Sequence, residues 1–336
     1  MAPASPTFSL SNPLILCLSW APDLPSFRSR TRNNAFWVLK RCMMNRILPV
    51  AFAVFLLSVL AACGPKEIPP PEIKPPAKVA LVLGAGASRG FTHIGVLKIL
   101  EANRVPIHLI VGTSAGSFVG CLYAYGFNAF QLQSLSFSIE KGDIIDLTVP
   151  DKGFIKGEKL ESYVNHMVNN TPIEKMRTPF YAVATDIQSG KEVVFASGNT
   201  GTAVRASCSI PGIFQPVRIG EKTYVDGGLV SPVAVDYARK IGADLVIAVD
   251  ISSWDSSATP QTTMETIMQS VVIMYSKISQ NQLARADIVI RPKVGHMSST
   301  DFSKRHEAVL EGEKAALEAM PAIKQALDKL RAEGRR

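Results

Sequence analysis

From residue 79 onward, short runs of β-branched and apolar residues alternate with longer segments in which apolar residues recur at helical spacing. This alternation predicts βαβ units and an α/β fold with a mostly parallel central sheet. The first two predicted strands are almost wholly apolar, as expected where helices cover both faces of a sheet. The predicted strands are 79–83, 107–111, 180–186, 192–195, 223–225, 244–250 and 288–290. The predicted helices are 93–102, 115–125, 129–139, 158–168, 232–241, 263–284 and 303–330, the last with an expected kink or break at Pro321.

The N-terminal region is predicted to carry a secretory targeting signal. Residues 47–62 form an uncharged apolar run that follows Arg41 and Arg46 and is shorter than the roughly 20 residues of a spanning helix. The run ends in LAAC at 60–63, which resembles the lipobox of bacterial lipoproteins. That resemblance implies cleavage before Cys63, lipidation of its sulfur and anchoring in a bilayer. A signal anchor that ends in a cysteine is the alternative.

The residues before this run do not fit a signal peptide, which begins close to its N-terminus. Met43 or Met44 followed by Asn45 and Arg46 would give a normal start of a signal peptide. We therefore interpret residues 1–42 as an N-terminal extension that precedes the true translation start. Their Ser- and Arg-rich composition also resembles a mitochondrial transit peptide, which is the weaker alternative. Gly64 after the cysteine favours the outer membrane of a bacterial envelope, facing the periplasm. The expected divisions are 1–42 extension, 43–62 signal peptide, 63–77 lipidated cysteine and Pro-rich linker, and 78–336 folded domain.

Composition narrows the class of protein. Of 336 residues, 47% are hydrophobic and 19% charged, so a large core is possible and general disorder is excluded. The formal net charge is +8, but residues 1–62 hold six basic side chains against one acidic, which removes the main support for nucleic-acid binding. Cys121 and Cys208 lack metal-ligand spacing and are expected to be buried free thiols. The five histidines form no paired-ligand pattern.

The second predicted strand runs directly into Gly112-Thr113-Ser114-Ala115-Gly116 and then into a helix. This is the G-x-S-x-G nucleophile elbow in its required strand–turn–helix context. Gly112 and Gly116 allow the strand and helix to approach closely, and the helix N-terminus directs N–H groups at the serine. The pattern predicts that Ser114 is a nucleophile.

The first predicted strand ends in a glycine-rich turn, GAGASRG at 84–90, which is typical of an anion cradle. A dinucleotide fingerprint would have glycine at its sixth position and an acidic residue after the next strand. Here the sixth position is Arg89, and the next strand ends without an acid. The oxyanion of an acyl-transfer intermediate is therefore the better candidate anion.

A nucleophilic serine needs a base. In α/β-hydrolases the chain order is Ser, then Asp or Glu, then His, which Asp226 or Asp250 with His296 or His306 would satisfy nominally. That fold places several strands before its nucleophile, whereas Ser114 lies about 35 residues after the first strand begins. The topology therefore argues against a histidine triad.

Asp226 is the remaining candidate because it ends a predicted strand and precedes Gly227 and Gly228. Glycines permit close approach of the carboxylate to a serine on a neighbouring turn. An ordinary Asp-Gly turn is the alternative interpretation. The residues alone do not decide between the two.

Together these segments resemble the patatin-like phospholipase family, from Val79 to about Pro292. The blocks that carry the resemblance are RG at 89–90 with HIGVL at 93–97, GTSAG at 112–116, ATD at 184–186, SCSIPGIFQPV at 207–217, DGG at 226–228 and ADIVIRP at 286–292. The resemblance implies a three-layer α/β/α fold and an acyl hydrolase that acts on membrane phospholipids or lysophospholipids. It implies no metal or organic cofactor.

The resemblance also assigns roles. It implies a Ser–Asp dyad without histidine, with Ser114 as nucleophile and Asp226 as general base. The N–H groups of Gly86, Ala87 and Ser88 would form the oxyanion hole. The supporting residues would be Gly112, Gly116, Arg89, Gly90, Gly227 and Gly228. Arg89 is expected to order the loop, and His93 and Asp186 are expected to be structural.

One departure from the family pattern concerns the oxyanion loop. The family sequence is usually Gly-Gly-Gly-x-Arg-Gly, whereas this chain has alanine at positions 85 and 87. If the backbone needs a positive φ at either position, alanine strains it. A histidine-triad esterase and a catalytically weak envelope lipoprotein with a binding role remain the alternatives.

Overall fold

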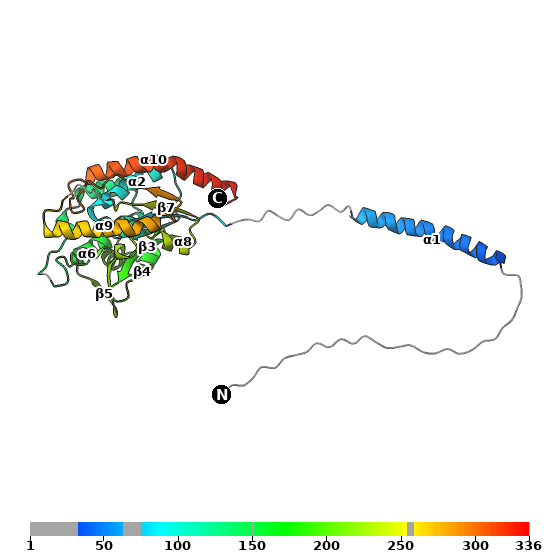
Figure 1. Ribbon diagram of the computed structural model, residues 1–336, viewed down its shortest axis with the longest axis horizontal. Coiled ribbons are helices and arrows are strands. Elements are labelled where there is room, and N and C mark those ends of the chain that lie inside the picture. The colour runs from blue at the N-terminus through cyan, green and yellow to red at the C-terminus, as the bar shows by residue number, and fades with distance from the viewer. Residues whose placement is uncertain (1–32, 63–74, 150, 254–258, 336) are drawn as a thin grey trace, which may run out of the picture. The chain divides into compact units, whose positions relative to one another are not determined.

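The computed structural model describes residues 33–62, 75–149, 151–253 and 259–335, which belong to two separate compact units, Met1–Glu72 and Ile73–Arg336 (Figure 1). The first unit contains one described helix, α1 (Asn33–Ala62). Cys63, with its predicted lipidation, lies outside the described residues. Within the described ranges, no helix combines the length and apolarity needed to cross a membrane.

The second unit alternates strands and helices along most of its length. Its strands are β1 (Val79–Leu83), β2 (Leu109–Thr113), β3 (Phe180–Asp186), β4 (Lys191–Phe195), β5 (Val217–Ile219), β6 (Lys222–Asp226), β7 (Leu245–Val249) and β8 (Ile288–Ile290). Its helices are α2 (Phe91–Ala102), α3 (Ala115–Tyr125), α4 (Ala129–Ser138), α5 (Lys141–Ile144), α6 (Glu158–Met167), α7 (Thr200–Cys208), α8 (Val235–Lys240), α9 (Thr263–Leu283) and α10 (Arg305–Ala332). Three 3₁₀ turns are η1 (Ala87–Gly90), η2 (Ile173–Lys175) and η3 (Gly227–Leu229).

The strands form one sheet in which each member of the series β5-β6-β3-β2-β1-β7-β8 pairs with the next, and β4 also pairs with β3. The pairs β1–β2, β1–β7, β2–β3 and β7–β8 are parallel. The pairs β3–β4, β3–β6 and β5–β6 are antiparallel. The prediction of a mostly parallel α/β sheet is confirmed.

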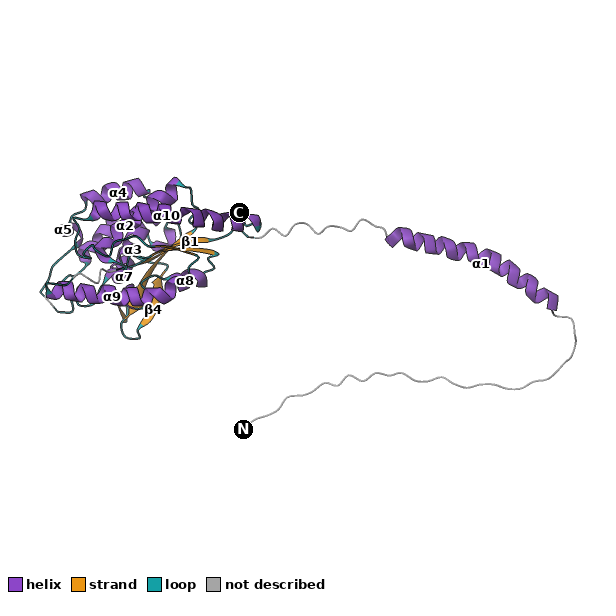
Figure 2. Cartoon of the chain, turned by 45° about the horizontal axis from the view of Figure 1, so that its top comes forward, coloured by secondary structure: helices purple, strands orange, loops and turns teal. Residues whose placement is uncertain are grey.

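Helices cover both faces of the sheet, which gives three layers (Figures 1 and 2). Side chains alternate along each strand, so Val79, Leu81 and Leu83 of β1 enter the core shared with α2, α3 and α10. Ala80 and Val82 enter the core shared with α8 and α9. Every residue of β1, β2 and β7 is buried, as the apolar runs predicted.

The structure differs from the sequence prediction in a few elements. The short strand β5 and the helices α5 and α7 were not predicted. Strand β2 begins two residues later than expected and extends to Thr113, because Thr113 continues the ladder opposite Val183. The expected break at Pro321 does not occur: α10 continues through it, with Met320 and Ile323 buried on either side. Packing of these side chains offsets the hydrogen bond that proline removes.

Candidate active site

Ser114 occupies a strained turn between β2 and α3. Its backbone has φ 54° and ψ −124°, a conformation that costs a non-glycine residue about 1–2 kcal/mol. The flanking glycines make this turn possible, because a Cβ on Gly116 would lie 2.0 Å from the Leu83 carbonyl oxygen. A Cβ on Gly112 would lie 2.5 Å from the Ser117 Cα. The predicted close approach of strand and helix is confirmed.

The register of the sheet brings Asp226 to this turn. Thr113 at the end of β2 pairs with Val183, and Asp226 at the end of β6 pairs with Ala184, the next residue of β3. Strand β4 pairs with the same two β3 residues and so occupies the opposite edge. Strands β2 and β6 therefore share one edge of β3 and meet end to end, which places the buried Asp226 beside the serine turn.

Asp226 is held by its own backbone and by one carboxylate oxygen. Its N–H donates to the Ser209 carbonyl (2.8 Å), and its carbonyl accepts from the Thr185 hydroxyl (2.9 Å). Oδ1 accepts from the Gly228 N–H at 2.7 Å. Oδ2 is buried and has no hydrogen-bond partner among the described residues. One oxygen of the carboxylate is thus fixed while the other stays available to a proton.

Burial raises the pKa of Asp226 to about 6, against opposing effects of the Ser114 hydroxyl, the Gly228 N–H and the Tyr275 hydroxyl. A carboxylate with this pKa is ionised at neutral pH and is a stronger base than an exposed aspartate. The arrangement of Ser114 and Asp226 can therefore activate the serine oxygen.

Tyr275 is a neighbour of Asp226 that sequence reasoning missed. It lies on α9 with 2% of its surface exposed, and its hydroxyl has no partner within the described structure. Its ring packs over the turn after Asp226, since a Cβ on Gly228 would lie 2.3 Å from the Tyr275 Cζ. Burial, with Asp226 nearby, raises the Tyr275 pKa well above its ordinary value, so the hydroxyl keeps its proton. No motif in the sequence marks this residue.

Helix α7 supplies two further residues. The hydroxyl of Ser207 accepts from the Ser114 N–H (2.9 Å) and donates to the Val183 carbonyl (2.6 Å), which ties the nucleophile turn to β3. Cys208 and Cys121 are buried free thiols, as predicted, and Cys208 lines the cavity at Ser114. Ser207 and Cys208 begin one of the sequence blocks that carry the family resemblance, which was the available signal for their position.

The glycine-rich loop supplies fewer free donors than predicted. The N–H of Ser88 donates to the Ser299 carbonyl at 3.0 Å, whereas the N–H groups of Gly86 and Ala87 have no acceptor among the described residues. Ala87 has φ 52°, so the expected alanine strain falls at this position and not at Ala85. Gly86 and Ala87 are therefore the better candidates for oxyanion donors.

Arg89 and His93 hold this loop in place. Arg89 is 4% exposed and donates to the carbonyls of Met297 (2.9 and 2.7 Å), Gly295 and Ser253. His93 is fully buried with Nε2 2.9 Å from the Gly84 carbonyl oxygen, and burial lowers its pKa to about 4. Both side chains bind the protein's own backbone, in agreement with a structural role.

The other candidate residues lie in separate surroundings. His296 is half-exposed and contacts Glu307 (2.8 Å), and His306 packs near Phe137. Asp250 accepts from the N–H and hydroxyl of Ser252, and Asp186 caps a turn at Gln188 and Ser189. No histidine is among the described residues that line the cavity at Ser114. Nor do three His, Cys, Asp or Glu side chains cluster as a metal site in the described parts of the chain.

An apolar cavity of about 340 Å³ opens at Ser114. Its walls come mainly from α3, α4, the segment before α6 and the start of α9, and include Phe118, Leu122, Leu135, Ile213 and Met268. Lys141 is the one charged residue among its described lining. An apolar group bound in this cavity would lie against the serine turn.

A strained serine on a strand-to-helix turn, within three α/β/α layers, defines the class of α/β proteins built around a nucleophile elbow. Residues 81–239 match the family model described as patatin-like phospholipase. These residues are a domain of this family.

Curated relatives share the domain within much longer proteins. Lysophospholipase NTE1 of Pyricularia oryzae is 29% identical over 235 residues, which are 68% of this chain and 16% of the relative. Patatin-like phospholipase domain-containing protein 6 of Homo sapiens is 35% identical over 187 residues, which are 53% of this chain and 14% of that protein. The chain therefore spans about a sixth or less of the length of these relatives. The crystal structure of VipD from Legionella pneumophila covers 75% of this chain and 67% of its own at 13% identity, with a TM-score of 0.43.

Proposed function

We propose that the protein is a serine acyl hydrolase that cleaves fatty-acyl esters of phospholipids or lysophospholipids. The observation that carries the proposal is the position of the buried Ser114, which lies beside the buried Asp226 and forms part of the lining of an apolar cavity. An ester carbonyl at Ser114 would leave its acyl chain in the cavity and its polar head outside. The printed names of the relatives, lysophospholipase and patatin-like phospholipase, support this substrate class.

In the proposed mechanism, Asp226 accepts the proton of the Ser114 hydroxyl as the oxygen attacks the ester carbonyl. The N–H groups of Gly86 and Ala87 stabilise the tetrahedral oxyanion, an effect commonly worth about 3 kcal/mol per donor. The intermediate collapses to an acyl-serine, and the leaving alcohol takes the proton from Asp226. Asp226 then accepts a proton from water as the water attacks the acyl-serine. It gives that proton to the Ser114 oxygen as the acyl–oxygen bond breaks, which releases the fatty acid and restores the serine hydroxyl and the carboxylate.

The direct test measures release of fatty acid from lysophosphatidylcholine and phosphatidylcholine. We expect Ser114→Ala and Asp226→Ala each to reduce turnover by about 10³-fold or more while the protein stays folded by circular dichroism. Turnover that survives in Asp226→Ala but fails in His296→Ala or His306→Ala would favour the histidine triad. The strain at Ala87 favours the alternative of a weakly catalytic binding protein, which absence of turnover by the folded parent would support.

We also propose that the mature chain is anchored through a lipidated Cys63, in the outer membrane of a bacterial envelope and facing the periplasm. The support is the apolar run that ends in LAAC at 60–63 and the Pro-rich linker that follows. Intact-mass analysis of the protein expressed in a bacterium tests this. A mature chain that begins at residue 63 with added acyl mass, and loses that mass in Cys63→Ser, is expected.

A further inference from the structure

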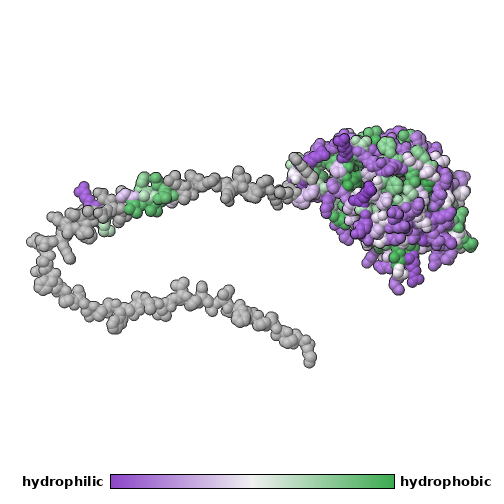
Figure 3. Space-filling model, turned by 180° about the vertical axis from the view of Figure 1, so that it is seen from behind, coloured by the Kyte–Doolittle hydropathy of each residue, from purple (hydrophilic) through white to green (hydrophobic). Residues whose placement is uncertain are grey.

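Three large apolar side chains are exposed close together in the segment between α5 and α6. Leu147 is 79% exposed, Val149 85% and Phe154 42%. We call these three residues the apolar tip. The face of the domain drawn in Figure 3 is mostly polar, with separate apolar patches. Apolar side chains gathered on a surface mark interaction sites more often than scattered ones do.

The apolar tip is continuous with the cavity that holds the nucleophile. Leu147 is both strongly exposed and part of the cavity lining, together with Ile145 and Ile155 of the same segment. Leu147 therefore joins the exposed tip to the mainly apolar lining that also contains Ser114. The continuity relates the tip to a substrate that enters the cavity.

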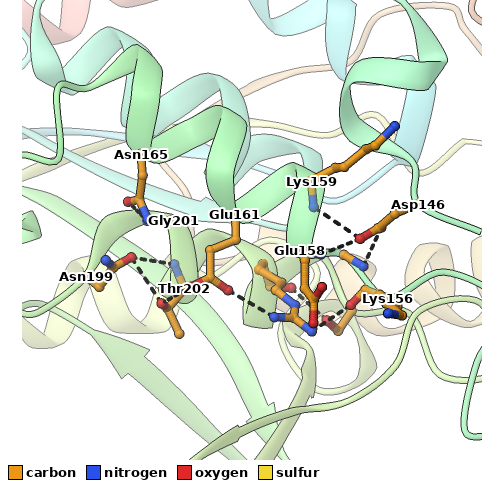
Figure 4. Close-up of polar contacts among 12 residues, drawn as sticks. Asp146, Lys156, Glu158, Lys159, Glu161, Asn165, Asn199, Gly201 and Thr202 are labelled. Carbon is orange, nitrogen blue, oxygen red and sulfur yellow. Dashed lines mark hydrogen bonds and ion pairs between the residues drawn. The ribbon is translucent and has the colours of Figure 1, made fainter.

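The base of the segment is firmly held. The Asp146 carboxylate accepts from the N–H groups of Gly157 (2.7 Å), Glu158 (2.9 Å) and Lys159 (3.2 Å), at the start of α6 (Figure 4). The Lys156 N–H donates to the Asp146 carbonyl at 3.0 Å. The tip is thus presented on a fixed support, so that its apolar side chains need not be ordered when they bind.

Further contacts bind both sides of the tip to the fold. The Thr148 N–H donates to the Phe154 carbonyl at 2.9 Å, which joins the two sides of the segment. The N–H groups of Phe154 and Ile155 both donate to the Ile213 carbonyl at 2.9 Å. Backbone hydrogen bonds therefore hold the described residues on both sides of the tip.

Charge does not dominate this surface. Lys152 and Lys156 lie on the segment, but Asp146 and Asp151 accompany them. Attraction to anionic head groups would therefore be weak, and burial of apolar surface would supply the binding.

We infer that the apolar tip inserts into a lipid surface and seats the mouth of the cavity against it. An acyl chain then passes from the lipid layer to Ser114 along apolar surface, without crossing water. The inference rests on the proposed function for the identity of the substrate. The occupant is a lipid layer, zwitterionic as well as anionic, because the insertion is apolar.

The test compares two full-chain variants that leave the cavity lining intact. Val149→Asp puts a charge on the tip, and Leu317→Asp puts the same charge on an exposed position of α10 (56% exposed) outside the lining. Hydrolysis of phosphatidylcholine vesicles by Val149→Asp should fall at least about tenfold, with less than about twofold change on a monomeric short-chain ester. Leu317→Asp should change neither. Any N-terminal anchor is the same in all three proteins and cancels in the comparison.

A second readout does not depend on activity. Tryptophan placed by Val149→Trp should be quenched by brominated phosphatidylcholine beyond the quenching of the parent, and tryptophan placed by Leu317→Trp should not. If the parent hydrolyses neither substrate but the tryptophan of Val149→Trp is quenched, the proposed function is contradicted and the insertion of the apolar tip is supported. Equal quenching at residues 149 and 317 would overturn the inference. So would equal rate losses of Val149→Asp on vesicles and on the monomeric ester. A parent protein that is a dimer in solution and that Val149→Asp dissociates would also overturn it.

Discussion

Two strand-to-helix turns meet at the active site, and each holds one strained residue. In the turn from β2 to α3 the strained residue is Ser114 (φ 54°), whose side chain is the proposed nucleophile. In the turn from β1 to α2 it is Ala87 (φ 52°), whose proposed contribution is its backbone N–H. The strain at the first turn cannot be removed by glycine, because the proposed reaction needs the serine side chain there. At the second turn glycine could keep the N–H and remove the strain.

The largest expected effect is on the base that serves the first turn. Asp226→Asn should lower kcat about 10³-fold, because the amide cannot accept the Ser114 proton. A rate within tenfold of the parent would contradict the dyad. Steady-state hydrolysis of a monomeric ester measures the change.

Asp226→Asn, which lowers kcat, should raise the free energy of unfolding at neutral pH. Burial raises the pKa of Asp226 from 3.8 to about 6, so the folded state binds this proton more tightly than the unfolded state. The stability that the protonated group contributes is present below about pH 4 and is lost as the pH rises through 6. The neutral amide of Asp226→Asn avoids the buried charge, so the unfolding free energy of the variant relative to the parent should rise by up to about 3 kcal/mol between pH 4 and 8. Urea unfolding measures both proteins across this range. If the difference in unfolding free energy between variant and parent does not change with pH, Asp226 is not buried as described.

The next effect concerns the close packing of the first turn. Gly116→Ala would place its Cβ 2.0 Å from the Leu83 carbonyl oxygen, so the helix must move away from β1. We expect a loss of about 3 kcal/mol of unfolding free energy and loss of activity. Gly142→Ala is the matched control, since its Cβ would meet nothing within 4 Å. Similar unfolding midpoints for the two variants would contradict this geometry.

A smaller effect is expected at Tyr275, which packs over the turn that follows Asp226. Its hydroxyl forms no hydrogen bond within the described structure but lies close enough to Asp226 to lower the pKa of the carboxyl group. Tyr275→Phe should therefore raise that pKa and move the acid limb of the kcat/KM profile to higher pH. The loss of kcat/KM should be about three- to tenfold at pH 6. It should be smaller at pH 8, where Asp226 is ionised in both proteins. Tyr237→Phe on α8 controls for loss of a tyrosine hydroxyl elsewhere. A loss that is constant with pH would indicate a packing defect instead.

The smallest effect separates the two turns. Ala87→Gly should raise the unfolding free energy by about 1 kcal/mol, because glycine adopts φ 52° without the steric cost of a Cβ. The N–H remains in place, so kcat should change less than about threefold. Urea unfolding at one pH measures the first quantity. Destabilisation by this substitution would mean that the alanine methyl packs usefully and that the loop is not strained.

The sequence was sufficient to predict the elbow turn at Ser114 but not the surroundings of that turn. Ser114 is marked by a five-residue motif that is local in the chain, and the elbow geometry follows from its glycines. The pairing of Ser114 with Asp226 depends on β2 and β6 meeting on one edge of β3, over 100 residues apart, which no local pattern encodes. The family resemblance supplied that pairing.

The residues that were missed act through tertiary contacts. Ser207 lies on α7, whose small residues and Gly201 give weak helical periodicity, and Tyr275 is one apolar position of a long helix. Ser88 was expected as an oxyanion donor, but its N–H meets the Ser299 carbonyl from a segment over 200 residues away. Such contacts are set by the packed fold and not by spacing.

The most direct test of the account is the intact mass of the full chain after treatment with a fluorophosphonate probe, beside Ser114→Ala. The account predicts a single adduct on the folded parent, none on Ser114→Ala, and strongly reduced labelling of Asp226→Asn. No adduct on the folded parent, or an adduct that persists in Ser114→Ala, would contradict the claim that this turn activates Ser114.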